Sequence, residues 1–346
     1  MSREGPEEYW QAPRERVDLG PGAAPILLTV LSTEEEFDWS KPFDRAATSV
    51  RAAAHIERAQ RVFDEHGVRP VYVVDYPIAS QQGSVGPLKA IADAGRCEIG
   101  AHLHPWVSPP LDEEMSVRNS FPGNLPGDLE ARKLRQLTQT IEESFGRRPT
   151  TYQAGRYGFG PGTAELLERE GYDCDLSASP GFDYSPEGGP DYTDFDPVPF
   201  WFGARRRMLA IPVTGAFVGF ARDGARGLLS AGQRAGLRWA RVPAVLSHLG
   251  AIERSRLSPE GFDHAAQRRL TKTLFEGGVR VFVFSFHSPS MMPGCTPYVR
   301  DERELAAFLE TCRRYYQYFL GELGGVSMTA RELVQHLRAH APQGSR

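Results

Sequence analysis

Two histidines spaced two residues apart, His102 and His104, are the clearest candidate ligands for a metal ion in this sequence. Residues i and i+2 of a strand or extended loop project to the same side, so both imidazoles can reach one ion. Zinc and similar divalent ions commonly take histidine nitrogen together with carboxylate oxygen and leave a position for water. The same pair is also compatible with one loop-capping histidine and one exposed histidine, so the metal interpretation depends on a nearby carboxylate.

A run of acids supplies such carboxylates. Glu34, Glu35 and Glu36 follow residues 26–31, an almost continuous apolar segment that predicts a strand covered on both faces. Acidic runs are usually solvated loops or helix N-termini. Their position directly after a buried strand, with Asp38 close behind, favours a role in the site.

His287 is a third candidate, because it ends the strongly apolar segment 279–286. A histidine at that position is suited to act as a general acid for a leaving amine, since its pKa lies close to neutral pH. The alternative is a hydrogen-bonded histidine of the core.

Strand and helix patterns alternate along most of the chain, which predicts an α/β fold with a parallel sheet built from βα units. We expect one domain over residues 25–340, preceded by an N-terminal arm at 1–24 and interrupted by a helical insertion at 221–255. Further expectations are a helix over 43–66, a long irregular loop over 181–199, and a strand or hairpin arm over 208–213. In a βα barrel the chemistry gathers where strands end. The segments 32–38, 102–106 and 153–157, together with His287, all reach that position.

These four segments, in this order, resemble the motifs of the polysaccharide deacetylase family. In this sequence they are Leu-Thr-Val-Leu-Ser-Thr-Glu-Glu-Glu-Phe-Asp-Trp at 28–39, Glu-Ile-Gly-Ala-His-Leu-His-Pro-Trp at 98–106, Gln-Ala-Gly-Arg-Tyr-Gly at 153–158 and Phe-Ser-Phe-His-Ser-Pro at 284–289. The resemblance covers residues 26–334. It implies a distorted (β/α)7 barrel with long loops, a divalent metal ion, with zinc the expected one, and water attacking an amide or ester carbonyl.

From the residues and the resemblance together, we expect roles for individual residues. The ion would be held by Glu34, His102 and His104, with Glu35 as the acceptor of the water proton and His287 as the donor to the leaving nitrogen. The substrate would contact Arg156 and Tyr157, which orient it or stabilise an oxyanion, Trp106, which offers a face for a sugar, and also Gln153 and Asp38.

The sequence departs from the family pattern at three positions. If Glu34 is a ligand, Ser32 stands where the family usually has the aspartate that acts as base, and Gln153 stands where it has the arginine that pairs with this aspartate. Losing both charges is self-consistent, because losing the aspartate alone would leave a buried arginine uncompensated. The family's second histidine, four residues after the first, falls at Trp106, so His104 would have to take its place.

The composition excludes some partners. A formal net charge of -4 and a pI near 6.2 argue against nucleic acid or an anionic membrane surface, which select basic proteins. Without an apolar run long enough to span a membrane or a secretory signal, we expect a cytoplasmic protein. The predicted function is metal-dependent hydrolysis of a non-peptide C–N bond, with an N-acylated sugar or small molecule as substrate. The alternatives are a non-catalytic relative that binds a glycan or a partner, and a metal hydrolase for esters or cyclic amides.

Overall fold

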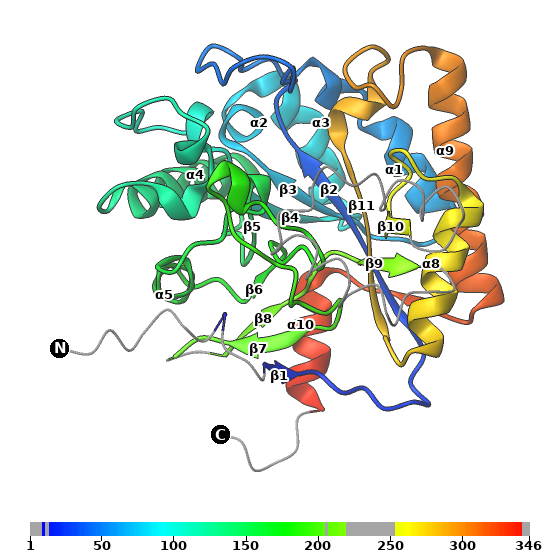
Figure 1. Cartoon of the computed structure of the whole chain (residues 1–346). Coiled ribbons are helices and arrows are strands. Elements are labelled where there is room, and N and C mark those ends of the chain that lie inside the picture. The colour runs from blue at the N-terminus through cyan, green and yellow to red at the C-terminus, as the bar shows by residue number, and fades with distance from the viewer. Residues whose placement is uncertain (1–8, 11–13, 205–206, 219–252, 341–346) are drawn as a thin grey trace, which may run out of the picture.

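Seven parallel strands form the centre of the molecule (Figure 1), as the computed structural model shows for residues 9–10, 14–204, 207–218 and 253–340. They lie in the order β8, β6, β5, β4, β3, β2 and β11. Their bounds are β2 Ile26–Thr33, β3 Val71–Val74, β4 Glu98–Leu103, β5 Thr151–Ala154, β6 Cys174–Asp175, β8 Met208–Ala210 and β11 Val281–His287. Among the described residues β8 and β11 do not pair with each other, so the barrel stays open there. The expected α/β domain of the distorted-barrel type is confirmed.

Shorter strands extend this sheet. β7 Phe200–Phe202 pairs antiparallel with β8, as the hairpin alternative for 208–213 predicted, and β1 Glu15–Arg16 pairs with β7. β12 Val326–Ser327 pairs with the start of β2. A separate two-stranded sheet joins β9 Gly215–Val218 to β10 Glu253–Arg256. The last residues of the expected helical insertion are therefore a strand, and 219–252 lie outside the described residues.

Helices cover the outside of the sheet and close one end of it. They are α1 Glu57–Glu65, α2 Tyr76–Ser80, α3 Gln82–Asp93, α4 Leu129–Phe145, α5 Thr163–Glu170, α8 His264–Glu276, α9 Glu302–Tyr316 and α10 Ala330–Ala339. Single turns add η1 Arg51–His55, η2 Pro105–Val107, η3 Arg118–Ser120, η4 Pro122–Asn124, η5 Gly155–Tyr157, η6 Ser185–Glu187, η8 Ser288–Met291 and the π-helical turn η9 Gln317–Glu322.

The expected helix over 43–66 begins later than predicted. Residues 43–50 form turns, η1 follows, and the α-helix itself starts at Glu57. Phe43, in this non-helical stretch, packs with its ring 4.7 Å from that of Trp106, which follows β4.

Strand β2 shows why residues 26–31 are almost continuously apolar. Every one of its residues is buried. Leu27 and Leu31 belong to the large cluster under the outer helices, whereas Ile26, Leu28 and Val30 belong to the cluster inside the barrel. A strand covered on both faces needs apolar residues at all positions rather than at alternate ones. Helix α10 contributes its apolar face to the inner cluster and so closes the amino end of the barrel (Figure 1).

Within the expected N-terminal arm, Tyr9 contributes to the core. Tyr9 is fully buried, its hydroxyl donates a hydrogen bond of 2.7 Å to Asp175 Oδ2, and its ring stacks on Phe159 at 3.8 Å. A buried carboxylate requires hydrogen-bond donors, and Tyr9 supplies one of them.

All four cysteines, Cys97, Cys174, Cys295 and Cys312, are unpaired. Among the described residues, no helix combines the length and the apolar character needed to cross a lipid bilayer.

Candidate metal centre

The ends of β2 and β4 bring three candidate ligands together. Glu34 directly follows β2, His102 lies in β4 and His104 follows it. The Nε2 atom of each imidazole lies 3.5 Å from the same oxygen of Glu34, Oε2. All three side chains are buried, and their donor atoms are close enough to bind a single ion. The structure therefore places the three ligands predicted from the sequence in one cluster.

The chemistry of this donor set suits a divalent metal ion. Burial lowers the pKa of both His102 and His104, so each imidazole is neutral at neutral pH and keeps a lone pair for a metal. Burial raises the pKa of Glu34, but His287 and the two ligand histidines outweigh it and bring that pKa to about 2. Ligands arranged tetrahedrally at roughly 2.0–2.1 Å from zinc lie about 3.4 Å apart, close to the spacing seen between these atoms.

Neighbouring groups orient both imidazoles. The Nδ1 atom of His102 lies 3.1 Å from the main-chain oxygen of Gln153, which can only accept, so Nδ1 carries the proton and Nε2 is left for the metal. The Nδ1 atom of His104 lies 2.9 Å from Glu35 Oε2. Metal-binding histidines characteristically use a carbonyl and a carboxylate in this way, which fixes their tautomer and ring orientation.

Glu35 contacts His104 through Nδ1, the ring nitrogen opposite the one that faces Glu34. It is fully buried, and its second oxygen, Oε1, accepts a 2.8 Å hydrogen bond from Trp106 Nε1. Burial raises the pKa of Glu35 to about 7. Because both oxygens are engaged away from Glu34, the expected role of Glu35 as acceptor of the water proton conflicts with its position. The sequence pattern gave no sign of which of the adjacent acids would turn towards His104.

Asp75 is a buried member of this arrangement that the sequence analysis missed. Its Oδ2 accepts a 2.9 Å hydrogen bond from the amide of Glu35 and lies 3.9 Å from His104 Nδ1, while Oδ1 accepts from the amide of Ile78 at 2.8 Å. It is the first residue after β3, so it stands at the same edge of the sheet as the other site residues.

Ser32 and Gln153 form the neutral pair that the sequence analysis expected. Both are buried, and Ser32 Oγ donates a 3.0 Å hydrogen bond to Gln153 Oε1. The other two acids that follow β2, Glu36 and Asp38, have partners of their own. Glu36 accepts from the amide of Ala52 at 2.6 Å and so caps η1. Asp38 is exposed and accepts from the amide of Ser40, so its expected contact with substrate finds no support.

His287 forms a dyad with Glu260, a residue that sequence reasoning missed. The Nδ1 atom of His287 lies 2.7 Å from Glu260 Oε2, and the main-chain amide donates to Oε1 at 3.1 Å. Burial lowers the pKa of His287, but Glu260 and Glu34 outweigh it and raise that pKa to about 9. The imidazole is therefore protonated at neutral pH. A further hydrogen bond joins the two strand ends, from the amide of Glu34 to Ser288 Oγ at 3.3 Å.

Trp106 does not offer the expected sugar-stacking face. Its side chain is 1% exposed, with the ring stacked on His104 at 4.3 Å and its Nε1 bound to Glu35. Trp39 is the exposed aromatic residue here, at 53% exposure, with its ring 6.2 Å from that of Trp106. The packing against His104 makes Trp106 part of the ligand support, which its type and position alone did not reveal.

Arg156 and Tyr157 follow β5 with positive φ angles of 54° and 58°. Left-handed backbone is uncommon for residues other than glycine, asparagine and aspartate, and it is often found at functional sites. Arg156 pairs with Glu187 and donates to Ser120 Oγ at 2.6 Å. The Tyr157 hydroxyl accepts a 3.0 Å hydrogen bond from Arg256. Both residues thus reach the strand ends, as predicted, and Arg156 already has partners in the protein.

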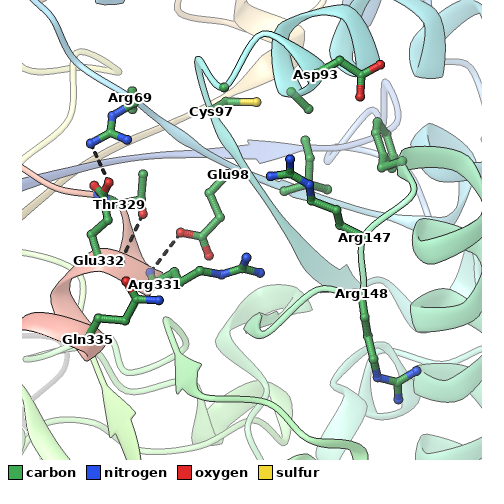
Figure 2. Close-up of a pocket in the computed structure, with 14 residues that line it drawn as sticks. Arg69, Asp93, Cys97, Glu98, Arg147, Arg148, Thr329, Arg331, Glu332 and Gln335 are labelled. Atoms are coloured by element: carbon green, nitrogen blue, oxygen red, sulfur yellow. Dashed lines mark hydrogen bonds and ion pairs between the residues drawn. The ribbon is translucent and has the colours of Figure 1, made fainter. Parts of the chain in front are cut away.

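A hollow of about 280 Å³ lies at the other end of the barrel (Figure 2). Its walls come from the amino ends of the strands and from the start of α10, and they include Arg69, Glu98, Arg147, Arg148 and Arg331. The hollow is therefore separate from the metal ligands, which stand at the carboxyl ends.

Known structures share this architecture. The chain is similar to a protein assigned as a polysaccharide deacetylase from Mycobacterium smegmatis, with a TM-score of 0.57 and 16% identity over 95% of each chain. A protein assigned likewise from Pseudomonas aeruginosa PAO1 gives a TM-score of 0.55 and 17% identity over 98% of this chain and 95% of that one. The fold is that of the polysaccharide deacetylases. The PuuE allantoinase shares it, with a TM-score of 0.56 and 15% identity over 99% and 95% of the two chains. No protein-family model and no curated protein sequence matches the chain.

Proposed function

We propose that this protein is a metal-dependent hydrolase of a non-peptide C–N bond, acting on an N-acylated sugar or a related small molecule. The observation that carries the proposal is the ligand cluster of Glu34, His102 and His104, whose two imidazoles are each oriented through Nδ1 so that both Nε2 atoms face one carboxylate oxygen. The shared fold of the deacetylases supports the substrate class.

When bound, a divalent ion such as zinc would polarise the scissile carbonyl and lower the pKa of water. The residues of the chain orient the ligands, donate a proton and contact the substrate. Glu35 and the main-chain oxygen of Gln153 keep the two imidazoles in place. His287, held through Nδ1 by Glu260, has Nε2 free to give a proton to the leaving nitrogen. Trp39, in place of Trp106, offers an exposed aromatic face to the substrate.

The proton of the attacking water lacks a dedicated acceptor at the Ser32 position. A serine hydroxyl that donates to Gln153 cannot take up a proton at neutral pH. We therefore propose slow turnover for the natural sequence. The double substitution Ser32→Asp with Gln153→Arg would place a carboxylate and its counter-charge there, and we expect it to raise kcat at least tenfold.

The same neutral pair favours a second candidate function, in which the protein binds a metal ion and a glycan without hydrolysing it. The two candidates differ in what the metal does. In a hydrolase, chelation abolishes turnover and added zinc restores it. In a binding protein, glycan affinity depends on the metal, but no product forms.

The test is a panel of acylated compounds, namely N-acetylated sugars, O-acetylated sugars and cyclic amides, incubated with protein loaded with zinc, cobalt or manganese. We expect release of acetate from N-acetylated sugars, lost on chelation and absent from the variant His102→Ala with His104→Ala. Activity that survives in this variant would contradict the proposal. An absence of product from the wild type and from Ser32→Asp with Gln153→Arg would leave the binding protein as the function.

A further inference from the structure

Arg256, the last residue of β10, is a charged side chain that the proposed chemistry does not yet use. Its guanidinium donates to the hydroxyls of Tyr157 at 3.0 Å, Ser179 at 2.8 Å and Tyr184 at 2.7 Å. It also lies over the ring of Phe182, 3.8 Å from the centroid. The surrounding side chains are thus neutral, and most of them are aromatic.

This guanidinium has no counter-charge among the described residues. No carboxylate there comes within ion-pair distance of Arg256, in contrast to Arg156 nearby, which pairs with Glu187. An arginine carries five N–H donors, and three hydrogen bonds are seen here. The Nε atom is buried and has no acceptor among the described residues. A buried donor on a buried charge is costly to leave unsatisfied, so an arginine in this state is suited to receive an anion.

The position of Arg256 ties it to the proposed active site. Its partner Tyr157 belongs to the left-handed turn after β5, the strand whose Gln153 orients His102. The next residue, Leu257, accepts a 3.1 Å hydrogen bond from the amide of Ser285 in β11, two residues before His287. Arg256 therefore lies between the carboxyl ends of β5 and β11, on the side of the barrel where the proton donor stands, and β10 lies beside β11 in Figure 1.

We propose that Arg256, with the hydroxyls of Tyr157 and Tyr184, forms a subsite for an anionic group of the substrate, a carboxylate or a phosphate. This proposal rests on the proposed function, because it assigns a substrate class to the same site: an N-acylated sugar that carries a negative charge away from its scissile amide. A neutral sugar would offer hydroxyls to these donors but would leave the charge of Arg256 uncompensated. A carboxylate or phosphate neutralises the charge of the guanidinium, and arginine matches the shape of both anions.

The test measures anion binding in metal-free protein, so that neither the metal centre nor turnover contributes. Phosphate and acetate are titrated separately by isothermal titration calorimetry at constant ionic strength, with chloride as the balancing ion, into wild type, Arg256→Gln and Arg268→Gln. Arg268 is the matched control, because it also lies over a tyrosine ring, that of Tyr318 at 4.1 Å, but belongs to α8.

We expect wild type and Arg268→Gln to bind at least one of the two anions with equal affinity, and Arg256→Gln to bind it at least tenfold more weakly. The preferred anion distinguishes a sugar acid from a phosphorylated sugar. Failure of both anions to bind wild type, or equal binding by Arg256→Gln, would overturn the proposal. If Arg256→Gln does not fold, crystals of the metal-free wild type are soaked in selenate instead. An anomalous peak beside the guanidinium of Arg256 supports the subsite, and its absence refutes it.

The outcome is independent of the hydrolase assay. Anion binding lost in Arg256→Gln together with a failed substrate panel would mean that the subsite exists and the proposed chemistry does not. Metal-dependent hydrolysis of neutral N-acetylated sugars without anion binding would mean the reverse.

Discussion

The two ends of the barrel both carry charged side chains, but they use them differently. At the carboxyl end, Glu34, Glu35 and Asp75 are buried beside the two ligand histidines. Glu35 is hydrogen-bonded to His104, and Asp75 accepts from the amide of Glu35. At the amino end, the arginines around the hollow of Figure 2 are partly or fully exposed, and Arg69 pairs with Glu332 of α10.

The hollow and the cluster of buried, mutually oriented charges therefore lie at opposite ends of the barrel. Desolvating a carboxylate costs several kcal/mol unless partners compensate, so a cluster of buried and mutually oriented charges is expensive to build. Exposed ion pairs cost and contribute little. Four predictions test the contrast, and they run from the largest expected effect to the smallest.

His287→Ala, at the carboxyl end, is expected to lower kcat/KM by roughly 10²–10⁴-fold, because it removes the proton donor to the leaving nitrogen. Glu260→Gln should have a smaller effect, since it only weakens the positioning of the ring. The measurement is steady-state hydrolysis of the compound that the panel identifies, normalised to bound metal. Arg148→Ala, at the amino-end hollow, is the control and should leave kcat/KM unchanged. An unchanged value in His287→Ala would remove this histidine from the mechanism.

Lys133→Met is expected to cost about 3–5 kcal/mol in the free energy of unfolding, because it leaves a buried carboxylate without its partner. Lys133 is fully buried, pairs with Glu113 at 2.9 Å and donates to the main-chain oxygens of Pro105 and Ser108, which follow the ligand His104. Urea denaturation measures the loss. The double substitution Lys133→Met with Glu113→Leu should recover most of it. A cost below 1 kcal/mol for the single substitution would show that the Lys133–Glu113 pair is not needed for stability.

Asp175→Asn tests a buried acid away from the metal ligands. Burial raises the pKa of Asp175 from 3.8 to about 6. Between these two pH values the folded protein holds a proton that the unfolded chain has lost, so this group makes stability fall as the pH rises from 4 to 6. The total is on the order of 3 kcal/mol. The variant should lack this fall in urea denaturation across the pH range, whereas Asp191→Asn, an exposed control, should retain it. Identical slopes in Asp175→Asn and wild type would contradict the assignment.

Arg69→Ala, at the amino end, is expected to lower the free energy of unfolding by less than 1 kcal/mol, because its ion pair with Glu332 is largely exposed, at 51% and 32%. Urea denaturation at low and high salt measures it. A loss above 2 kcal/mol would mean that the amino-end arginines are as important to the fold as the buried pairs.

The fold was largely predictable, because a strand covered on both faces leaves an unmistakable apolar segment, as in β2 and β11. The cluster of Glu34, His102 and His104 was predictable for two reasons. Glu34 comes soon after such a strand, and the two-residue spacing of the histidines puts both on one side of an extended segment. The supporting residues were harder. Whether Glu35 or Glu36 turns inward depends on tertiary partners, and Trp106 was misjudged because burial beside His104 is invisible in the sequence.

Glu260 and Arg256 were missed because the sequence analysis predicted a helical insertion up to residue 255, whereas Arg256 ends strand β10 and Glu260 comes soon after it. Their contacts to His287 and Tyr157 join positions 27 and 99 residues apart in the chain. Asp75 alone could have been found, by extending to β3 the rule that was applied to the other strand ends.

The most direct test of the account is the metal content of the purified protein by elemental analysis after reconstitution with zinc, compared with that of His102→Ala combined with His104→Ala. The account predicts one ion per chain in wild type and none in the double variant, with both proteins folded by circular dichroism. Wild type that binds no metal, or a double variant that binds as much as wild type, would contradict the metal centre at the carboxyl ends of β2 and β4.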